Sequence, residues 1–209
     1  MSLLKVLSIT EFDKKKRKVL LSEDLALVLY PGDLRKYQIE EGSSLSAESV
    51  QEITNLLCRR ARERVMGLLE ISDKTEFELR SRLKREGYPE EAVEKALEAV
   101  RRYGYVNDEA YSQRYAQNRS RSKSRLQIVN GLMQKGIERE KALEILEEIP
   151  IDEEGQIRRL LEQKGYWGRK LERKEMERAA GMLARRGYSF DAIRKALNSS
   201  DTEWMSGSI

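Results

Sequence analysis

Arginine and lysine side chains are the residues of this sequence with the clearest capacity for chemistry. From Arg119 to Arg125, cations alternate with serines across an expected helix break, which suits flexible contacts with phosphates or carboxylates. A solvated helix face explains the same residues, and both interpretations stay open. Arg185 and Arg186 would also complement the dipole at the end of a helix. The candidate binding residues are Arg101, Arg102, Arg114, Arg119, Arg121, Lys123, Arg125, Arg169, Lys170, Arg185 and Arg186.

Groups that would support catalysis are missing from the sequence. It contains no histidine, which removes the commonest general base and metal ligand. It also lacks the glycine-rich loops that cradle nucleotide phosphates. Glu172-Arg173-Lys174 has the spacing of a nuclease Glu-x-Lys motif, but it lies in a helical pattern with no strand before it. Cys58 fits a small buried hydrophobe better than a reactive thiol. We therefore expect a non-enzymatic binding protein without a metal or cofactor.

The composition is typical of a helical protein with charged outer faces. Of 209 residues, 36% are charged and 39% are hydrophobic, and the formal net charge is +4. One cysteine allows no disulfide within a chain, so a reducing compartment is expected. The apolar run at 3–9 is too short for a signal peptide, and nothing approaches the roughly 18 apolar residues of a membrane span. We expect a cytoplasmic monomer without membrane association, and a solvated face for the acidic run 138–154.

Glycines followed by apolar residues recur along the chain. If such a glycine ends a helix in the left-handed conformation, the next residue contacts the side chain five positions before it. Both members of each such pair are apolar here. The pattern predicts a helix, a glycine stop and a second helix, repeated about every fifty residues. The pairs are Tyr88 with Leu83 around Gly87, Ile137 with Leu132 around Gly136, Tyr166 with Leu161 around Gly165, and Tyr188 with Leu183 around Gly187.

The expected fold is all-α, with tandem three-helix repeats in an elongated curved stack and a small N-terminal antiparallel β meander. Strands are expected at 5–10, 17–22 and 25–30, followed by a short helix at 34–39 that Asp33 caps. Thr75 and Glu78 form a capping box, and 41–44 is the expected hinge. The predicted segments are 1–45 for the meander and short helix, 46–71 for a covering helix, 72–122 for repeat 1, 123–166 for repeat 2, 167–198 for a partial repeat 3 without its third helix, and 199–209 for a frayed tail.

Four stretches of the sequence resemble motifs of the bacterial RecX regulatory proteins. Residues 75–88 resemble the family's Ser-x-x-Glu-Leu opening and its Lys-Gly stop, and 103–111 resemble its Gly-Tyr-(Leu/Ile)-Asp-Asp segment. Residues 128–137 and 183–189 are similar to two helix ends that come later in the sequences of the same family. Departures at Asn107, Gly131 and Tyr188 concern packing and capping. The structural positions of these family motifs are Thr75, Glu78, Leu79, Leu83, Gly87, Tyr105, Asp108, Tyr111, Gly136, Gly187 and Tyr188.

The resemblance, which spans about residues 65 to 197, implies a function as well as a fold. It implies a regulator that binds the RecA–DNA filament and limits its growth or promotes its disassembly, which would modulate recombination, DNA repair and the SOS response. The alternative is a general DNA-binding helical repeat protein that acts without RecA. For Tyr88, Tyr105, Tyr111 and Tyr188, packing in the core and at helix ends is favoured over stacking on bases.

Overall fold

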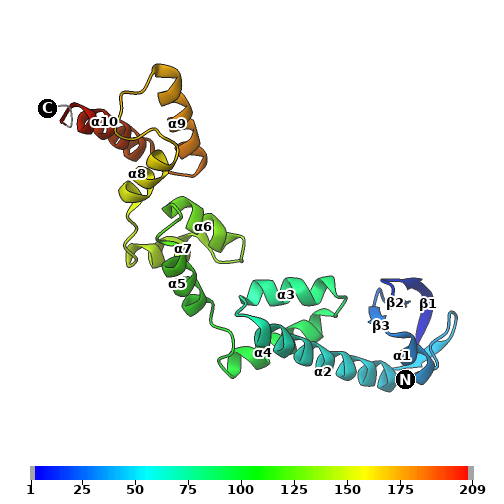
Figure 1. Ribbon diagram of the computed structural model, residues 1–209. Coiled ribbons are helices and arrows are strands. Elements are labelled where there is room, and N and C mark those ends of the chain that lie inside the picture. The colour runs from blue at the N-terminus through cyan, green and yellow to red at the C-terminus, as the bar shows by residue number, and fades with distance from the viewer. Residues whose placement is uncertain (1–2, 207–209) are drawn as a thin grey trace. The chain divides into compact units, whose positions relative to one another are not determined.

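The structure, a computed structural model, describes the backbone of residues 3–206 and the side chains of residues 3–199. The chain forms two compact units, the first ending at Asn107 and the second beginning at Asp108 (Figure 1). Each unit has its own hydrophobic core. Within residues 3–206, no helix has the length and apolar character needed to cross a membrane.

The first unit begins with a four-stranded antiparallel sheet in the order β3-β2-β1-β4. The strands are β1 (Leu3–Glu11), β2 (Arg17–Leu21), β3 (Ala26–Leu29) and β4 (Ser44–Ser46). The predicted meander is therefore confirmed, but β4 was not predicted. Leu45 pairs with Leu4, and Ser44 with Lys5, so the expected hinge at 41–44 leads into the edge of the sheet.

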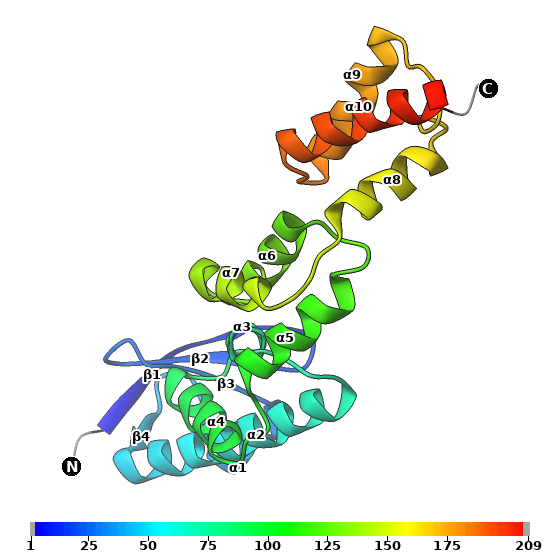
Figure 2. The same cartoon turned by 90° about the vertical axis from the view of Figure 1, so that its left-hand side faces the viewer.

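Four helices complete the first unit, namely α1 (Pro31–Lys36), α2 (Ala47–Ile71), α3 (Glu76–Arg85) and α4 (Glu90–Arg102) (Figure 2). Sheet residues Val19 and Leu27 belong to the same buried core as Ile53 of α2 and Leu97 of α4. The meander therefore packs on the helices rather than forming a separate body. As predicted, the Thr75 hydroxyl accepts from the Glu78 amide, and the Glu78 carboxylate accepts from the Thr75 amide.

The short helix α1 corrects the expectation for Asp33. Tyr30 is the N-cap and Pro31 begins the helix, so Asp33 lies inside the first turn. Its carboxylate accepts from the Tyr30 amide at 3.0 Å and forms a two-pronged ion pair with Arg60 of α2. Proline suits the first helical position because its missing N–H would have had no partner there. Asp33 thus ties α1 to α2.

The second unit contains α5 (Asp108–Arg119), α6 (Arg125–Met133), α7 (Arg139–Glu147), α8 (Glu153–Gln163), α9 (Arg173–Arg185) and α10 (Phe190–Ser206). One buried cluster joins α5, α6 and α7, and another joins α8, α9 and α10. The helix α10 extends through Ser206, whereas the sequence led us to expect a frayed segment from residue 199, and 207–209 lie outside the described residues.

Each group of three helices begins one helix earlier than the sequence led us to expect. Three-helix groups are α2–α4, α5–α7 and α8–α10, whereas the sequence led us to begin repeat 1 at α3 and to leave the last repeat incomplete. The division at Asn107 falls inside the predicted repeat 1. A glycine stop identifies two consecutive helices but does not indicate which flanking helix joins them. The predicted boundaries differ from the observed grouping for this reason.

All four predicted glycine stops have the left-handed conformation, with φ between +68° and +86°. In each, the amide after the glycine donates to the carbonyl five residues before it, as from Tyr88 to Leu83 at 3.1 Å and from Tyr166 to Leu161 at 2.8 Å. Gly104 forms a fifth stop of the same kind, in which the Tyr105 amide donates to the Val100 carbonyl. These local helix ends are confirmed.

Candidate nucleic-acid and protein interface

The turn between α5 and α6, residues 119–125, carries the basic stretch identified in the sequence. Ser124 ends this turn as the N-cap of α6, where its hydroxyl accepts from the Gln127 amide and the Gln127 side chain accepts from the Ser124 amide. The Ser124 hydroxyl also donates to the Arg186 carbonyl at 2.7 Å. Ser124 is fully buried. The turn is therefore fixed at its C-terminal end both locally and by a contact with the end of α9.

Gln156 of α8 fixes the rest of this turn. Its side chain is almost fully buried, and its amide nitrogen donates to the carbonyls of Ser120 at 2.6 Å and Lys123 at 3.2 Å. Its amide oxygen accepts from the Tyr188 hydroxyl at 2.8 Å. One buried side chain thus connects the basic turn to the glycine stop after α9. Nothing in the local sequence pattern indicated this role.

The fixed turn exposes Arg119 and Arg121 and leaves Lys123 partly exposed. The Arg119 guanidinium lies 5.4 Å from the centroid of the Tyr115 ring. Among the residues whose side chains the structure describes, no carboxylate forms an ion pair with Arg119, Arg121 or Lys123. Their charges are thus available to an anionic partner. Arg125 differs, because its guanidinium donates to the Leu146 carbonyl at 3.0 Å and holds α6 to the end of α7.

Other predicted binding residues have local partners instead. Arg101 pairs with Glu76 at 3.1 Å, and Arg169 pairs with Glu175 at 2.6 Å. The hydrogen bond from Arg169 is the main reason why the pKa of Glu175 falls to about 2. Arg186 has one buried guanidinium nitrogen for which the described residues offer no hydrogen-bond partner. Arg101 and Arg169 are weaker candidates than the turn, because their guanidinium groups already pair with carboxylates.

The remaining candidates are not gathered into one site. Arg102 lies over the ring of Tyr103 at the end of α4, in the first unit, together with Arg101. Arg114 and Arg185 are exposed on α5 and α9, and Lys170 is exposed before α9. Within the second unit, the structure thus brings together the candidates of the α5–α6 turn, and the Arg186 carbonyl lies beside them through its contact with Ser124.

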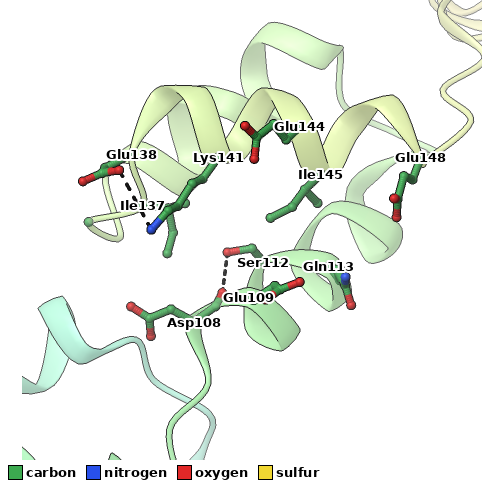
Figure 3. Close-up of a pocket in the computed structure, with 11 residues that line it drawn as sticks. Asp108, Glu109, Ser112, Gln113, Ile137, Glu138, Lys141, Glu144, Ile145 and Glu148 are labelled. Carbon is green, nitrogen blue, oxygen red and sulfur yellow. Dashed lines mark hydrogen bonds and ion pairs between the residues drawn. The ribbon is translucent and has the colours of Figure 1, made fainter.

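A groove between α5 and α7 was not predicted. Figure 3 shows the side chains of Asp108, Glu109, Glu138, Glu144 and Glu148 around a cavity of about 440 Å³. Ile137 and Ile145 supply apolar surface, and Lys141 pairs weakly with Glu138, at 3.9 Å. The acidic run expected to be a solvated face thus lines one wall of a groove. In the described part of the chain, no group of three or more potential ligands is placed to hold a metal ion.

The motif tyrosines pack in different ways. Tyr188 is 5% exposed and Tyr88 is half-buried, in agreement with packing at helix ends. Tyr111 stacks on Tyr115 with ring centroids 6.3 Å apart. Tyr105 departs from the prediction, since its ring is 56% exposed although its amide completes the Gly104 stop.

Gly131, which departs from the motif that the sequence resembles, is explained by a close contact. A Cβ at this position would collide with the hydroxyl of Tyr115. Glycine therefore allows α5 and α6 to approach each other at this point.

The structure defines a class of protein: tandem three-helix modules with a basic turn held in place by buried polar contacts, an architecture typical of helical repeat proteins that bind partners. Comparison with known families then identifies the chain. Residues 61–98 match the first three-helix domain of RecX, and residues 107–146 match the second.

Similar proteins extend these matches over most of the chain. The regulatory protein RecX of Caldanaerobacter subterraneus subsp. tengcongensis is 32% identical over 164 residues, which cover 77% of this chain and 81% of that protein. The regulatory protein RecX of Clostridium perfringens strain 13 is 29% identical, with 75% and 76% covered. The chain belongs to the RecX family of regulatory proteins.

Solved structures agree on the fold. A crystal structure of regulatory protein RecX aligns with a TM-score of 0.62 and 21% identity, covering 93% of this chain and 99% of that one. The structure of RecX from Lactobacillus salivarius aligns with a TM-score of 0.57 and 17% identity, covering 70% and 97%.

Proposed function

We propose that this protein is a non-enzymatic regulator that binds the RecA–DNA filament and limits its growth or promotes its disassembly. Membership in a family of regulatory proteins supports a regulatory role. The fixed α5–α6 turn supports contact with an anionic partner, because Arg119, Arg121 and Lys123 form no ion pair with the described side chains. DNA phosphates and carboxylates on a protein surface both provide suitable anions.

Regulation of a filament has a characteristic stoichiometry. A protein that blocks the end of a filament, or destabilises neighbouring subunits, affects many subunits for each molecule bound. The hydrolysis of ATP by RecA on single-stranded DNA should therefore fall when this protein is present at far fewer than one molecule per RecA. The protein is proposed to act as a cytoplasmic monomer, which analytical ultracentrifugation would test.

The experiment is a titration of this protein into RecA on single-stranded DNA, with ATP hydrolysis as the readout. We expect inhibition at substoichiometric ratios. Unchanged hydrolysis together with binding to bare DNA would overturn the proposal and favour a general DNA-binding protein. Unchanged hydrolysis without DNA binding would overturn both.

Matched variants test whether the basic turn makes the contact. Arg119→Gln, Arg121→Gln and Lys123→Gln together remove three cations that lack ion pairs in the described structure. The control removes Arg173, Arg194 and Lys195, which pair with Glu177, Asp191 and Glu154, by the same substitution to glutamine. We expect the turn variant to inhibit much less than the control. Equal inhibition by the two folded variants would show that the turn is not the contact.

A further inference from the structure

A run of five cations, Lys14 to Lys18, lies at the turn between β1 and β2. The turn has a defined backbone conformation, because the Asp13 carboxylate accepts from the amides of Lys15 at 2.7 Å and Lys16 at 2.8 Å. The hydrogen bond from the Lys15 amide is the main cause of the lowered pKa of Asp13. The only acidic side chain within this turn is therefore engaged with the backbone.

Two of the five cations, Lys16 and Arg17, are partly buried and have partners within the protein. The Lys16 ammonium donates to the Glu86 carbonyl at 2.9 Å and lies 5.4 Å from the centroid of the Tyr88 ring. The Arg17 guanidinium donates to the Asp13 and Lys16 carbonyls at 3.4 and 3.1 Å. The Lys16 contacts hold the turn against the connection between α3 and α4, and the Arg17 contacts stabilise the turn itself.

The other three cations, Lys14, Lys15 and Lys18, are exposed. Within the side chains that the structure describes, none of them forms an ion pair. Holding like charges next to one another on a fixed turn is unfavourable unless a polyanion or counterions neutralise them. The turn is thus suited to an anionic partner with closely spaced charges.

Two partly exposed aromatic rings lie near this turn. Phe12 is 37% exposed at the start of the turn, and Tyr30 is 39% exposed, with the Lys16 ammonium 5.5 Å and the Arg60 guanidinium 5.1 Å from its ring centroid. Aromatic rings beside cations are the combination that binds single-stranded nucleic acids, because bases stack on the rings while cations contact the phosphates.

We propose that the β1–β2 turn of the N-terminal sheet is a binding site for single-stranded nucleic acid, with Lys14, Lys15 and Lys18 on the phosphates and with the exposed part of Phe12 available to stack on a base. This site is separate in sequence from the α5–α6 turn. The inference deepens the proposed function and rests on it, because a RecA filament offers DNA as well as protein.

The test measures the binding of the full-length protein to a fluorescently labelled oligodeoxythymidylate by anisotropy, without RecA, over a range of salt concentrations. The test variant carries Lys14→Gln and Lys15→Gln. The control carries Lys84→Gln and Lys95→Gln, which remove two half-exposed lysines of the same unit that already pair with Glu90 and Glu91. Both variants lose the same net charge, so any difference between them depends on position.

We expect the test variant to bind about tenfold more weakly at 0.2 M monovalent salt. Log affinity falls linearly with log salt, and each lost phosphate contact makes this negative slope shallower by about 0.7. The slope should thus become shallower by about 1.4 for two lost contacts, whereas the control should keep the slope of the natural protein. Phe12→Ala should weaken binding without changing the slope, since stacking releases no counterions. Equal losses in the two lysine variants, or no binding by the natural protein, would overturn the inference.

Inhibition of RecA by the same variants separates the two proposals. A test variant that binds DNA normally but no longer inhibits RecA would overturn this inference in favour of an acidic protein contact, while leaving the proposed function standing. A natural protein that binds DNA through this turn but never inhibits RecA would support the site and contradict the proposed function.

Discussion

Gln156 is the residue whose replacement should most clearly test how the α5–α6 turn is held. Gln156→Leu keeps a side chain of similar size but removes one hydrogen-bond acceptor and one donor group. Three groups then lose their partner: the Tyr188 hydroxyl and the carbonyls of Ser120 and Lys123. Because the Gln156 side chain is only 3% exposed, water cannot easily take its place.

The expected cost follows from the groups left without partners. A buried polar group that loses its hydrogen bond costs about 1–3 kcal/mol. The leucine side chain recovers part of this loss by burying apolar surface. We therefore expect the free energy of unfolding of the second unit to fall by about 2 kcal/mol, which corresponds to roughly 10 °C in Tm for a unit of this size.

Tryptophan fluorescence can follow this unit alone, because both tryptophans, Trp167 and Trp204, belong to it. Gln163→Leu is the matched control, since Gln163 lies on the same helix but is exposed. Tyr188→Phe completes a double-mutant cycle with Gln156→Leu. The double variant should lose about 1 kcal/mol less stability than the sum of the losses in the two single variants, because removing both partners leaves fewer unpaired groups. A Gln156→Leu variant as stable as the control, or fully additive losses, would refute this reasoning.

Three further predictions concern individual contacts. Gly87→Ala should destabilise the first unit more than Gly42→Ala in urea unfolding followed by circular dichroism. Both glycines have a positive φ, but only a Cβ at Gly87 would meet another side chain. Equal losses of stability in the two variants would contradict this. Burial raises the pKa of Asp33, but the Arg60 guanidinium and the Tyr30 amide outweigh it and keep the pKa below its ordinary value. The Asp33–Arg60 pair contributes stability above the ordinary carboxyl pKa of about 4, and this contribution is lost as the pH falls through the lowered pKa of Asp33. Asp33→Asn should therefore flatten the dependence of the unfolding free energy on acidic pH. An unchanged pH dependence would contradict the linkage. Alanine favours a helix by about 1 kcal/mol relative to glycine. Gly131→Ala should nevertheless destabilise the second unit in fluorescence-detected unfolding, because its methyl group would meet the Tyr115 hydroxyl. A stabilised variant would show that the contact relaxes.

The helix ends could be predicted from the sequence because the interactions that form them are local. A glycine stop depends on residues within five positions of one another, as from Leu83 to Tyr88, and a capping box depends on residues three apart, as Thr75 and Glu78 are. The first three strands could be predicted in the same way from short apolar runs between turn residues. Family motifs added the order in which these elements occur.

Contacts between distant residues decided the rest. Gln156 binds carbonyls that lie 36 and 33 residues away, and the Asp33 carboxylate meets a guanidinium 27 residues away. The grouping of the helices also depends on which apolar faces meet, and several pairings satisfy the same periodicity. The sequence by itself determined the helix ends that glycine stops and the Thr75–Glu78 capping box define, and where cations are concentrated. Only the tertiary structure decided which cations are already paired and which remain available, because an ion pair depends on distance in space rather than on spacing along the chain.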